Sequence, residues 1–300
     1  MKKLIFPVLA IGLAVLSSCG KGEKVDLKLN LQPGSQYLYT METKMDMTQT
    51  AMGQSMKTNN DMTMEFVYDV TAADGNNKKI TVTYDRIAMQ MKSAMANMTY
   101  DSRDTTHNTP ELKMMGYMLH KPFTMLVSDH GEILKVEGLQ AIINNMGDST
   151  TAEGAAMRRQ LASSFNDSSM KGMMQQSLNF FPDKPVSVGD TWKKSYSMNM
   201  SIMAVNMDNE YKLTSVSNGI AHLDVSSKLT GGGDIAGGEE MKNVKVDLKG
   251  DQKGTMDVEV ATGLVVDSKL KQDIKGDISM MGMKIPLTMT QDIRITAKKK

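Results

Sequence analysis

The stretch Tyr37-Leu38-Tyr39-Thr40-Met41-Glu42-Thr43-Lys44-Met45-Asp46-Met47 indicates the fold class of this chain. Its odd positions carry aromatic residues, methionine or threonine, and its even positions are mostly polar. Successive side chains of a β-strand point to opposite sides of the sheet, so a period of two predicts a strand with one buried face. At roughly 3.3 Å per residue the stretch is about 36 Å long, which exceeds the usual strand.

The alternation continues along the chain. Met62–Val70 repeats it, and a turn around Gly53 separates the two segments. Further turn signals with glycine lie at Asp74-Gly75, Asp129-His130-Gly131, Ser217-Asn218-Gly219, Thr262-Gly263 and Met281-Gly282. One-faced alternation is typical of antiparallel sheets, because parallel strands are buried on both faces. We therefore predict a mainly β protein whose long antiparallel strands form a curved sheet or an open half-barrel.

One region breaks this pattern and predicts a helical insert near residues 138–181. It has no strand alternation and few β-branched residues. Helices are expected from Gly138, after Thr151 and after Asp167, with Thr151 and Asp167 as caps and Pro182 beyond the last helix. They would pack over the sheet or its open end. Residues 230–240 are rich in glycine and predict a loop.

The two halves of the chain begin alike. Pro33-Gly34-Ser35-Gln36-Tyr37 resembles Val188-Gly189-Asp190-Thr191-Trp192 at an offset of 155 residues, and the turn at Gly131 resembles the turn at Gly263 at an offset of 132. A duplication would give two half-sheets that meet in one curved sheet. Alternating hairpins also resemble one another without duplication, so both explanations stay open.

The N-terminus has the features of a secretion signal. Lys2 and Lys3 precede the apolar stretch Leu4–Leu16, which is too short for a permanent membrane span. The sequence Leu16-Ser17-Ser18-Cys19 resembles the bacterial lipobox, which implies cleavage before Cys19 and acylation of Cys19 on its thiol and its new amine. Two or more acyl chains anchor a protein stably in a membrane. No aspartate follows Cys19 directly, which resembles the sorting rule for the outer membrane and leaves the leaflet open.

These features predict five segments within one domain overall. They are a signal peptide (1–18), a lipidated tether (19–25), a first β half (26–137), a helical insert with linker (138–187) and a second β half (188–300).

Charge and motifs argue against several classes of function. The chain of 300 residues has 35 Lys and Arg against 34 Asp and Glu, so there is no electrostatic case for nucleic acid. One cysteine excludes a disulfide framework and a cysteine cluster for metal. The four histidines lack the spacing of metal ligands. Gly147-Asp148-Ser149 matches three letters of a hydrolase motif without a matching histidine motif after it. We predict neither catalytic residues nor a cofactor.

The 31 methionines are the unusual chemical feature of the chain. Pairs of the form M-x-M occur at 45/47, 62/64, 89/91, 198/200 and 281/283, and on a strand both members share one face. Such a face can be a closed core, the flexible lining of a hydrophobic ligand site, or a set of thioethers for Cu(I). The expected ligand-lining residues are Tyr37, Tyr39, Met41, Met45, Met62, Met64, Phe66, Tyr68, Trp192, Tyr196, Met198 and Met200.

One stretch also carries a family resemblance. Asn179-Phe180-Phe181-Pro182-Asp183-Lys184-Pro185-Val186-Ser187-Val188-Gly189-Asp190-Thr191-Trp192 resembles the most recognisable part of an uncharacterised Gram-negative lipoprotein family, a domain of unknown function. Leu29-x-Leu31-Gln32-Pro33-Gly34-x-x-Tyr37-x-Tyr39 and Ser128-Asp129-His130-Gly131-Glu132-Ile133 also fit that family. The resemblance covers nearly all of the mature chain and brings no activity with it.

Two functional hypotheses follow from these observations. A curved antiparallel sheet on a lipid anchor is loosely similar to lipoprotein carriers that hold acyl chains in a half-barrel, which implies binding of a lipid or another hydrophobic ligand. The main alternative is a structural or protein-interaction lipoprotein of the envelope with a closed core. Cu(I) binding through the M-x-M pairs is a third possibility.

Overall fold

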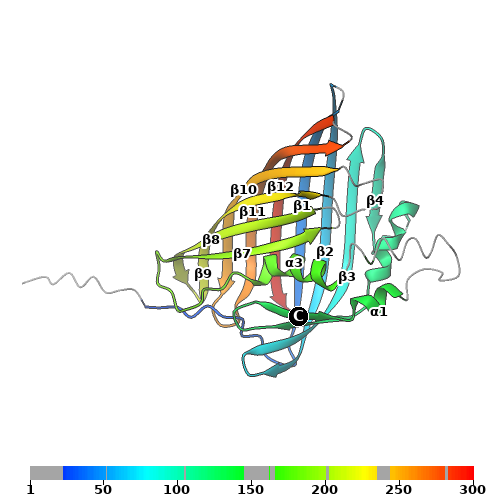
Figure 1. Ribbon diagram of the computed structural model, residues 1–300. Helices are drawn as coiled ribbons and strands as arrows, with labels where there is room; N and C mark the ends of the chain where they lie inside the picture. Colours follow the sequence, from blue (N-terminus) through cyan, green and yellow to red (C-terminus); the bar gives the residue numbers. More distant parts are fainter. Residues whose placement is uncertain are drawn as a thin grey trace, which may run out of the picture.

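The fold is a single curled β-sheet. The computed structural model describes residues 23–51, 53–104, 106–144, 162, 166–200, 203–234, 244–280 and 283–300. Within them, twelve strands form one sheet that is antiparallel throughout and does not close into a barrel (Figure 1). The prediction of a curved, open antiparallel sheet is confirmed. The expected signal peptide and Cys19 lie outside the described residues.

Most of the strands are long, as the alternation predicted, whereas β4, β5 and β6 have five residues each. In chain order they are β1 (Gln36–Ala51), β2 (Gln54–Asp74), β3 (Asn77–Ser93), β4 (Asn97–Asp101), β5 (Phe123–Val127), β6 (Ile133–Glu137), β7 (Thr191–Met200), β8 (Met203–Ser217), β9 (Ile220–Asp234), β10 (Lys245–Glu259), β11 (Leu264–Met280) and β12 (Met283–Lys299). The described helices are a 3-10 helix η1 (Pro110–Met118), α1 (Leu139–Asn144) and α3 (Asp167–Leu178).

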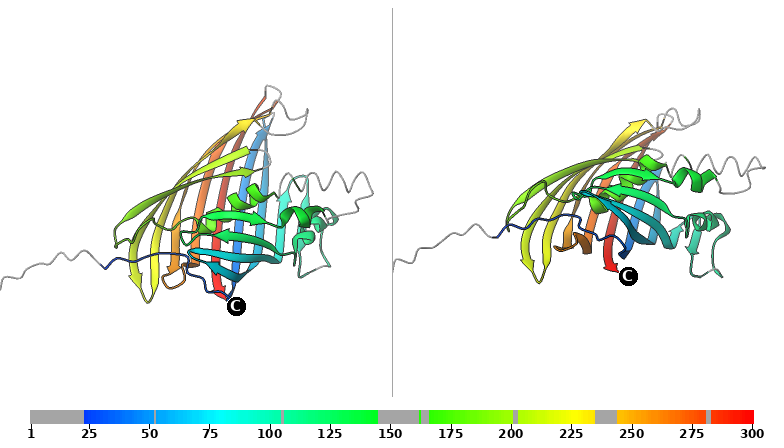
Figure 2. Two further views of the ribbon diagram at one scale, coloured as in Figure 1. Left: turned by 60° about the horizontal axis from the view of Figure 1, so that its bottom comes forward. Right: turned by 90° about the horizontal axis from the view of Figure 1, so that it is seen from below.

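The two ends of the chain meet in the middle of the sheet. The strand order is β6-β5-β3-β2-β1-β12-β11-β10-β9-β8-β7, and β4 pairs with β3. The first half of the chain therefore runs outward from β1 to one edge, and the second half starts at the other edge with β7 and runs back to β12. The helical region connects the two edges, and α3 packs against both β6 and β7 (Figure 2).

Both halves begin with the same turn. In segments 32–35 and 187–190 the amide of the fourth residue donates to the carbonyl of the first, over 3.1 and 3.0 Å. Gly34 and Gly189 hold the third place at φ of 80° and 95°, which is the geometry of a type II turn. The amides of these two glycines then donate to the carbonyls of Val70 and Leu213.

The strands that receive these hydrogen bonds also correspond. Thr71 follows Val70 in a bulge of β2, and Thr214 follows Leu213 in a bulge of β8. Each threonine hydroxyl donates to the carbonyl eight residues further on, over 3.2 and 2.9 Å. These shared details at corresponding places favour a duplication over a chance likeness of hairpins.

The segment before β1 closes one end of the curled sheet, which we call the base. Its Leu27, Leu29 and Leu31 are fully buried. The amide of Leu29 donates to the carbonyl of Asp129 over 2.7 Å, and the next amide donates to Thr262 over 2.8 Å. The two turns that resemble one another in sequence thus both bind this segment, which runs along the base (Figure 2).

Glycines allow the second half of the sheet to curl. A Cβ added at Gly254 would lie 1.9 Å from the carbonyl oxygen of Lys269, and one at Gly276 would lie 1.9 Å from that of Asp247. Neighbouring strands come this close only where a side chain is missing, so these glycines mark the tight parts of the curl.

Two local predictions need correction. Asn166, and not Asp167, caps α3, because its side chain accepts from the amide of Ser169 over 2.9 Å. The expected glycine loop begins later, because β9 runs through Gly231 to Asp234 in register with β10. The helix expected after Thr151 lies outside the described residues.

Candidate functional site

The concave face of β1, β2 and β3 changes from aromatic to methionine-rich along the strands. Near the base lie Tyr37, Tyr39, Phe66, Tyr68 and Tyr84, which we call the aromatic floor; all are buried. Further along lie Met41, Met45, Met47, Met62, Met89, Met91 and, on β4, Met98, which we call the methionine band; all are half-buried. The expected site residues of the first half therefore do share one face, as the period of two requires.

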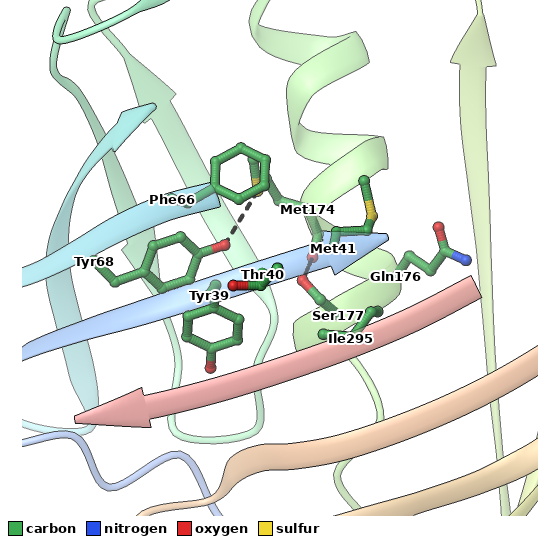
Figure 3. Close-up of a pocket in the computed structure, with 9 residues that line it drawn as sticks. All are labelled: Tyr39, Thr40, Met41, Phe66, Tyr68, Met174, Gln176, Ser177 and Ile295. Carbon is green, nitrogen blue, oxygen red and sulfur yellow. Dashed lines mark hydrogen bonds between the residues drawn. The ribbon is translucent and has the colours of Figure 1, made fainter. Parts of the chain in front are cut away.

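Helix α3 covers the aromatic floor. The hydroxyl of Tyr68 donates to the sulfur of Met174 over 3.3 Å (Figure 3). The hydroxyl of Tyr84 donates to the sulfur of Met170 over 3.9 Å. Tyr39 stacks on Tyr68 with 4.3 Å between ring centroids. The cavity left between helix and floor has a volume of about 30 Å³. Small-molecule pockets are typically about 300–1,000 Å³, so this end of the face is a closed core.

A row of polar side chains crosses the same concave face. Gln272 Nε2 donates to Gln252 Oε1 over 2.6 Å, and Gln252 Nε2 donates to Ser227 Oγ over 3.1 Å. Ser227 then donates to Asn209 over 2.6 Å, and Asn209 donates to the carbonyl of Lys194 over 3.1 Å. These five residues lie opposite one another on neighbouring strands from β11 to β7. The four whose side chains form the hydrogen bonds are buried, and they are Gln272, Gln252, Ser227 and Asn209. We call this set the polar row.

The polar row separates the core into two parts. One hydrophobic cluster lies on its base side and includes Leu270, Met256 and Tyr211. The other lies beyond it and includes Ile274, Leu248 and Met207. Because a buried amide must be hydrogen-bonded, the chain of bonds fixes the register of the strands that contribute to it.

Replacing one glutamine of the polar row should lower the free energy of unfolding more than replacing two bonded glutamines together. Gln252→Leu leaves the Nε2 group of Gln272 buried without an acceptor, and we expect a loss of about 2 kcal/mol in the free energy of unfolding. Gln252→Leu combined with Gln272→Leu removes both partners and should recover most of that loss. Urea unfolding of both variants measures this, and a double variant that is at least as destabilised as Gln252→Leu alone would contradict it.

The row continues into the first half but is not bonded there. Gln291 stands opposite Gln272 and Met45, and Met45 stands opposite Asn60. The Oδ1 atom of Asn60 is buried without a hydrogen-bond partner. Within the described part of the chain, the side chain of Gln291 also forms no hydrogen bond. We call Asn60, Met45 and Gln291 the open end of the polar row; it lies in the methionine band.

The expected site residues of β7 lie on both sides of the polar row. Trp192 donates its indole N–H to the carbonyl of Phe180 over 2.6 Å and stacks on Tyr211. Tyr196 lies beyond the polar row, and its hydroxyl donates to the sulfur of Met207 over 3.1 Å. Met198 and Met200 are described only by their backbone, at the far end of β7. Trp192 and Tyr196 therefore belong to separate clusters and not to one lining.

The three segments that carry the family resemblance come together at the base. The ring nitrogen Nδ1 of His130 lies 3.0 Å from the carbonyl oxygen of Pro182. A Cβ at Gly131 would lie 1.8 Å from the carbonyl oxygen of Leu178, so the turn sits directly against the end of α3. Leu29 bonds to the same turn. These contacts give the residues of the three segments a structural role, which is to hold the base together.

The convex face carries paired charges. Arg86 and Arg103 both bind Glu65, Arg86 also binds Asp101 over 2.7 Å, and Arg103 binds Asp85 over 2.8 Å. The bond from Arg86 lowers the pKa of Asp101. Two open grooves of about 510 and 560 Å³ lie on this side, and outward-facing charged side chains line both of them.

One chain of hydrogen bonds was not expected from the sequence. Ser217 Oγ lies 3.1 Å from His222 Nε2, and His222 Nδ1 lies 2.8 Å from Asp257 Oδ1, which is the connectivity of a catalytic triad. It lies at the β8–β9 turn on the convex face, and more than a third of each of the His222 and Asp257 side chains is exposed. Its residues line neither the cavity beneath α3 nor the two grooves of the convex face. The spacing of Ser217 and His222 across the predicted turn was the only sequence signal.

The described residues contain no group of three or more His, Cys, Asp or Glu side chains placed to hold a metal ion. No helix among them is long and apolar enough to cross a membrane.

Solved structures resemble this chain only loosely. A structure titled "Lipid-protein interactions in lipovitellin" matches at a TM-score of 0.49 and 8% identity; the match covers 89% of this chain and 25% of that chain, so this chain spans about a quarter of its length. The beta domain of the Bordetella autotransporter BrkA matches at a TM-score of 0.25 and 8% identity, over 89% of this chain and 100% of that chain. The translocator domain of NalP from Neisseria meningitidis matches at 0.24 and 8%, over 89% and 90%. These values carry no argument about function.

No curated protein matches the chain. One family profile matches residues 75–265, and it is described as a family of unknown function, DUF6263. The expectation that the chain belongs to a family of unknown function is confirmed. Because the match covers more than half of the residues of this chain, the chain belongs to the DUF6263 family.

Proposed function

We propose that this chain is a lipid-anchored, non-enzymatic protein of the cell envelope that holds a hydrophobic ligand against the methionine band. The observation that carries the proposal is the half-buried state of this band, on the concave face of an open sheet and next to a fully closed aromatic floor. Methionine side chains are flexible and polarizable, which suits apolar ligands of irregular shape. The sequence around Cys19 supports the anchor and the outer membrane as its place.

The anchor has a direct test. Cys19→Ala removes the thiol that would be acylated, so we expect the protein to move from the membrane fraction to the soluble fraction. Partitioning between detergent and water phases measures this, and the intact mass of the wild-type protein should exceed the mass of the bare chain by that of the acyl groups. A wild-type mass without added acyl groups would contradict the anchor.

Ligand binding is tested on the purified full chain. Native mass spectrometry of protein extracted from membranes should show a bound lipid, and a fluorescent fatty acid should bind to the protein after removal of that lipid. Met62→Lys places a charge in the band and should abolish binding, whereas Leu134→Lys changes an exposed side chain on β6 and should not. If neither a copurified lipid nor fatty-acid binding is found, the proposal fails.

A structural or protein-interaction role is the second candidate. It is favoured by the closed core at the aromatic floor, where the cavity of about 30 Å³ cannot hold an acyl chain. In that case the paired charges of the convex face would meet a protein partner. Crosslinking in cells would show a defined partner, and the ligand experiments would be negative.

Cu(I) binding is the third candidate, and cross-strand register favours one place for it. Met62 stands opposite Met89, and Met91 stands opposite Met98, so four thioethers lie on neighbouring strands. Competition with a Cu(I) chelator would detect binding, and Met89→Leu with Met91→Leu should remove it while keeping the apolar volume.

The absence of enzymatic activity is also open to test. The chain from Ser217 to Asp257 has the connectivity of a hydrolase triad, although its histidine and its carboxylate are more than one third exposed. We expect no labelling of Ser217 by a fluorophosphonate probe. Labelling that disappears in Ser217→Ala would overturn this part of the proposal.

A further inference from the structure

We propose that the open end of the polar row binds the amide or hydroxyl group of an amphiphile whose hydrocarbon chain lies along the methionine band. The inference rests on the proposed function and names the chemical class of the ligand. It starts from the Oδ1 atom of Asn60, which is buried without a hydrogen-bond partner.

An unpartnered buried acceptor calls for a donor. Burial removes Asn60 Oδ1 from water, and leaving it unpaired costs stability that a ligand N–H or O–H would restore. An ester or an ionised carboxylate offers acceptors only. The acceptor therefore selects ligands that carry a hydrogen-bond donor next to their hydrocarbon chain.

Gln291 supplies the complementary group on the other side of Met45. Asn60 and Gln291 both stand directly opposite Met45, on β2 and β12, so the three share one register row of the concave face. Two strand spacings separate Asn60 from Gln291, or about 10 Å between their backbones. A single amide group lying over Met45 can donate to Asn60 and accept from the side-chain NH₂ of Gln291.

The rest of the row explains why the ligand binds here and not further along. From Gln272 to Asn209 the polar side chains bond to one another and are buried, so they have no need of a ligand. At the open end, the apolar neighbours are half-buried methionines. Met47 pairs with Met289 in the next row outward, and Met62 pairs with Met89 in the next row inward. A chain attached to the amide therefore meets thioethers on both sides.

Two probes of the same shape test the donor requirement. N-methyldodecanamide and methyl dodecanoate differ in having an N–H or an ester oxygen at one position. Each would compete with N-phenyl-1-naphthylamine for the purified, delipidated full chain. We expect the amide to bind at least about tenfold more tightly than the ester, which is the usual effect of one satisfied buried acceptor.

Two variants locate the preference. In Asn60→Leu the amide and the ester should bind equally, and the urea midpoint should not fall because an unpartnered polar group is removed. Asn59→Leu is the matched control: Asn59 is the neighbouring residue of β2, is exposed, and bonds to Asp46 across the convex face. It should keep the tenfold preference.

The outcomes separate this inference from the proposed function. Equal binding of both probes to the wild type overturns the inference and leaves hydrophobic binding intact. A preference that survives in Asn60→Leu also overturns it. If the wild type binds neither probe and no fatty acid, the proposed function itself fails.

Discussion

The protein should unfold as the pH rises above 10, because burial in the core keeps five of its tyrosines neutral. Burial raises the pKa of Tyr39, Tyr68, Tyr84, Tyr196 and Tyr211 well above the usual value of 10. A group with a raised pKa in the folded state stays neutral there while it ionises in the unfolded chain. Its contribution is therefore complete below pH 10 and is lost as the pH rises from 10 towards the folded-state value.

The fall in stability is steep because the five groups act together. In the unfolded chain a tyrosine goes from half ionised at pH 10 to almost fully ionised at pH 11, so each of the five loses about 1 kcal/mol of stability over this interval and together they lose about 5 kcal/mol. That is comparable with the whole free energy of unfolding of an ordinary domain. Urea midpoints followed by circular dichroism from pH 8 to 11 measure the fall.

Two variants assign the effect to the tyrosines. Tyr68→Phe removes one ionisable group, so the fall in stability per pH unit should shrink by about one fifth. Phe66→Leu changes a neighbouring aromatic side chain without a hydroxyl, so it should lower the midpoint at every pH and leave the slope unchanged. A flat midpoint between pH 10 and 11 would refute the assignment.

Gly131→Ala should be the most damaging single substitution at the base. Gly131 has φ of 75°, and its added Cβ would lie 1.8 Å from the carbonyl oxygen of Leu178. The left-handed backbone costs about 1–2 kcal/mol for alanine, and the forced separation of the turn from α3 adds about 1–3 kcal/mol. We expect a loss of about 4 kcal/mol in the free energy of unfolding.

Gly219→Ala provides the matched control. Gly219 has nearly the same φ, 76°, but nothing lies within 4 Å of its added Cβ. It should therefore cost only the backbone share of about 1–2 kcal/mol. Denaturant unfolding of both variants separates the two contributions. Equal losses in the two variants would mean that the contact between the turn and α3 does not stabilise the base.

Two features of the candidate site could be read from the sequence. The alternation in β1 and β2 places the tyrosines and methionines of the expected lining on one face, and the structure has them there. The turn glycines also mark their turns correctly, as at Gly75 and Gly263, where φ is positive. Both are local properties, because the period of two and the conformation of glycine depend only on near neighbours.

The polar row could not be found in this way. Asn209, Ser227, Gln252 and Gln272 come from four strands, and each looks like an ordinary polar residue in its own segment. Their alignment depends on the lengths of the three connections between these strands and on two bulges, which together set the register. The same holds for Ser217, His222 and Asp257, which only pairing of β8, β9 and β10 brings together.

Long antiparallel strands with a methionine-rich face follow from the amino-acid sequence alone, because the alternation of apolar and polar residues along a strand is visible in neighbouring positions. What that face does along its length depends on how the strands assemble. The order β2-β1-β12-β11 joins the two ends of the chain, and α3 covers the aromatic floor. The register places Asn60 in the methionine band, where its Oδ1 atom has no hydrogen-bond donor. Contacts between residues more than two hundred positions apart, such as Met45 with Gln291, follow from the free energy of the whole sheet and not from any local pattern.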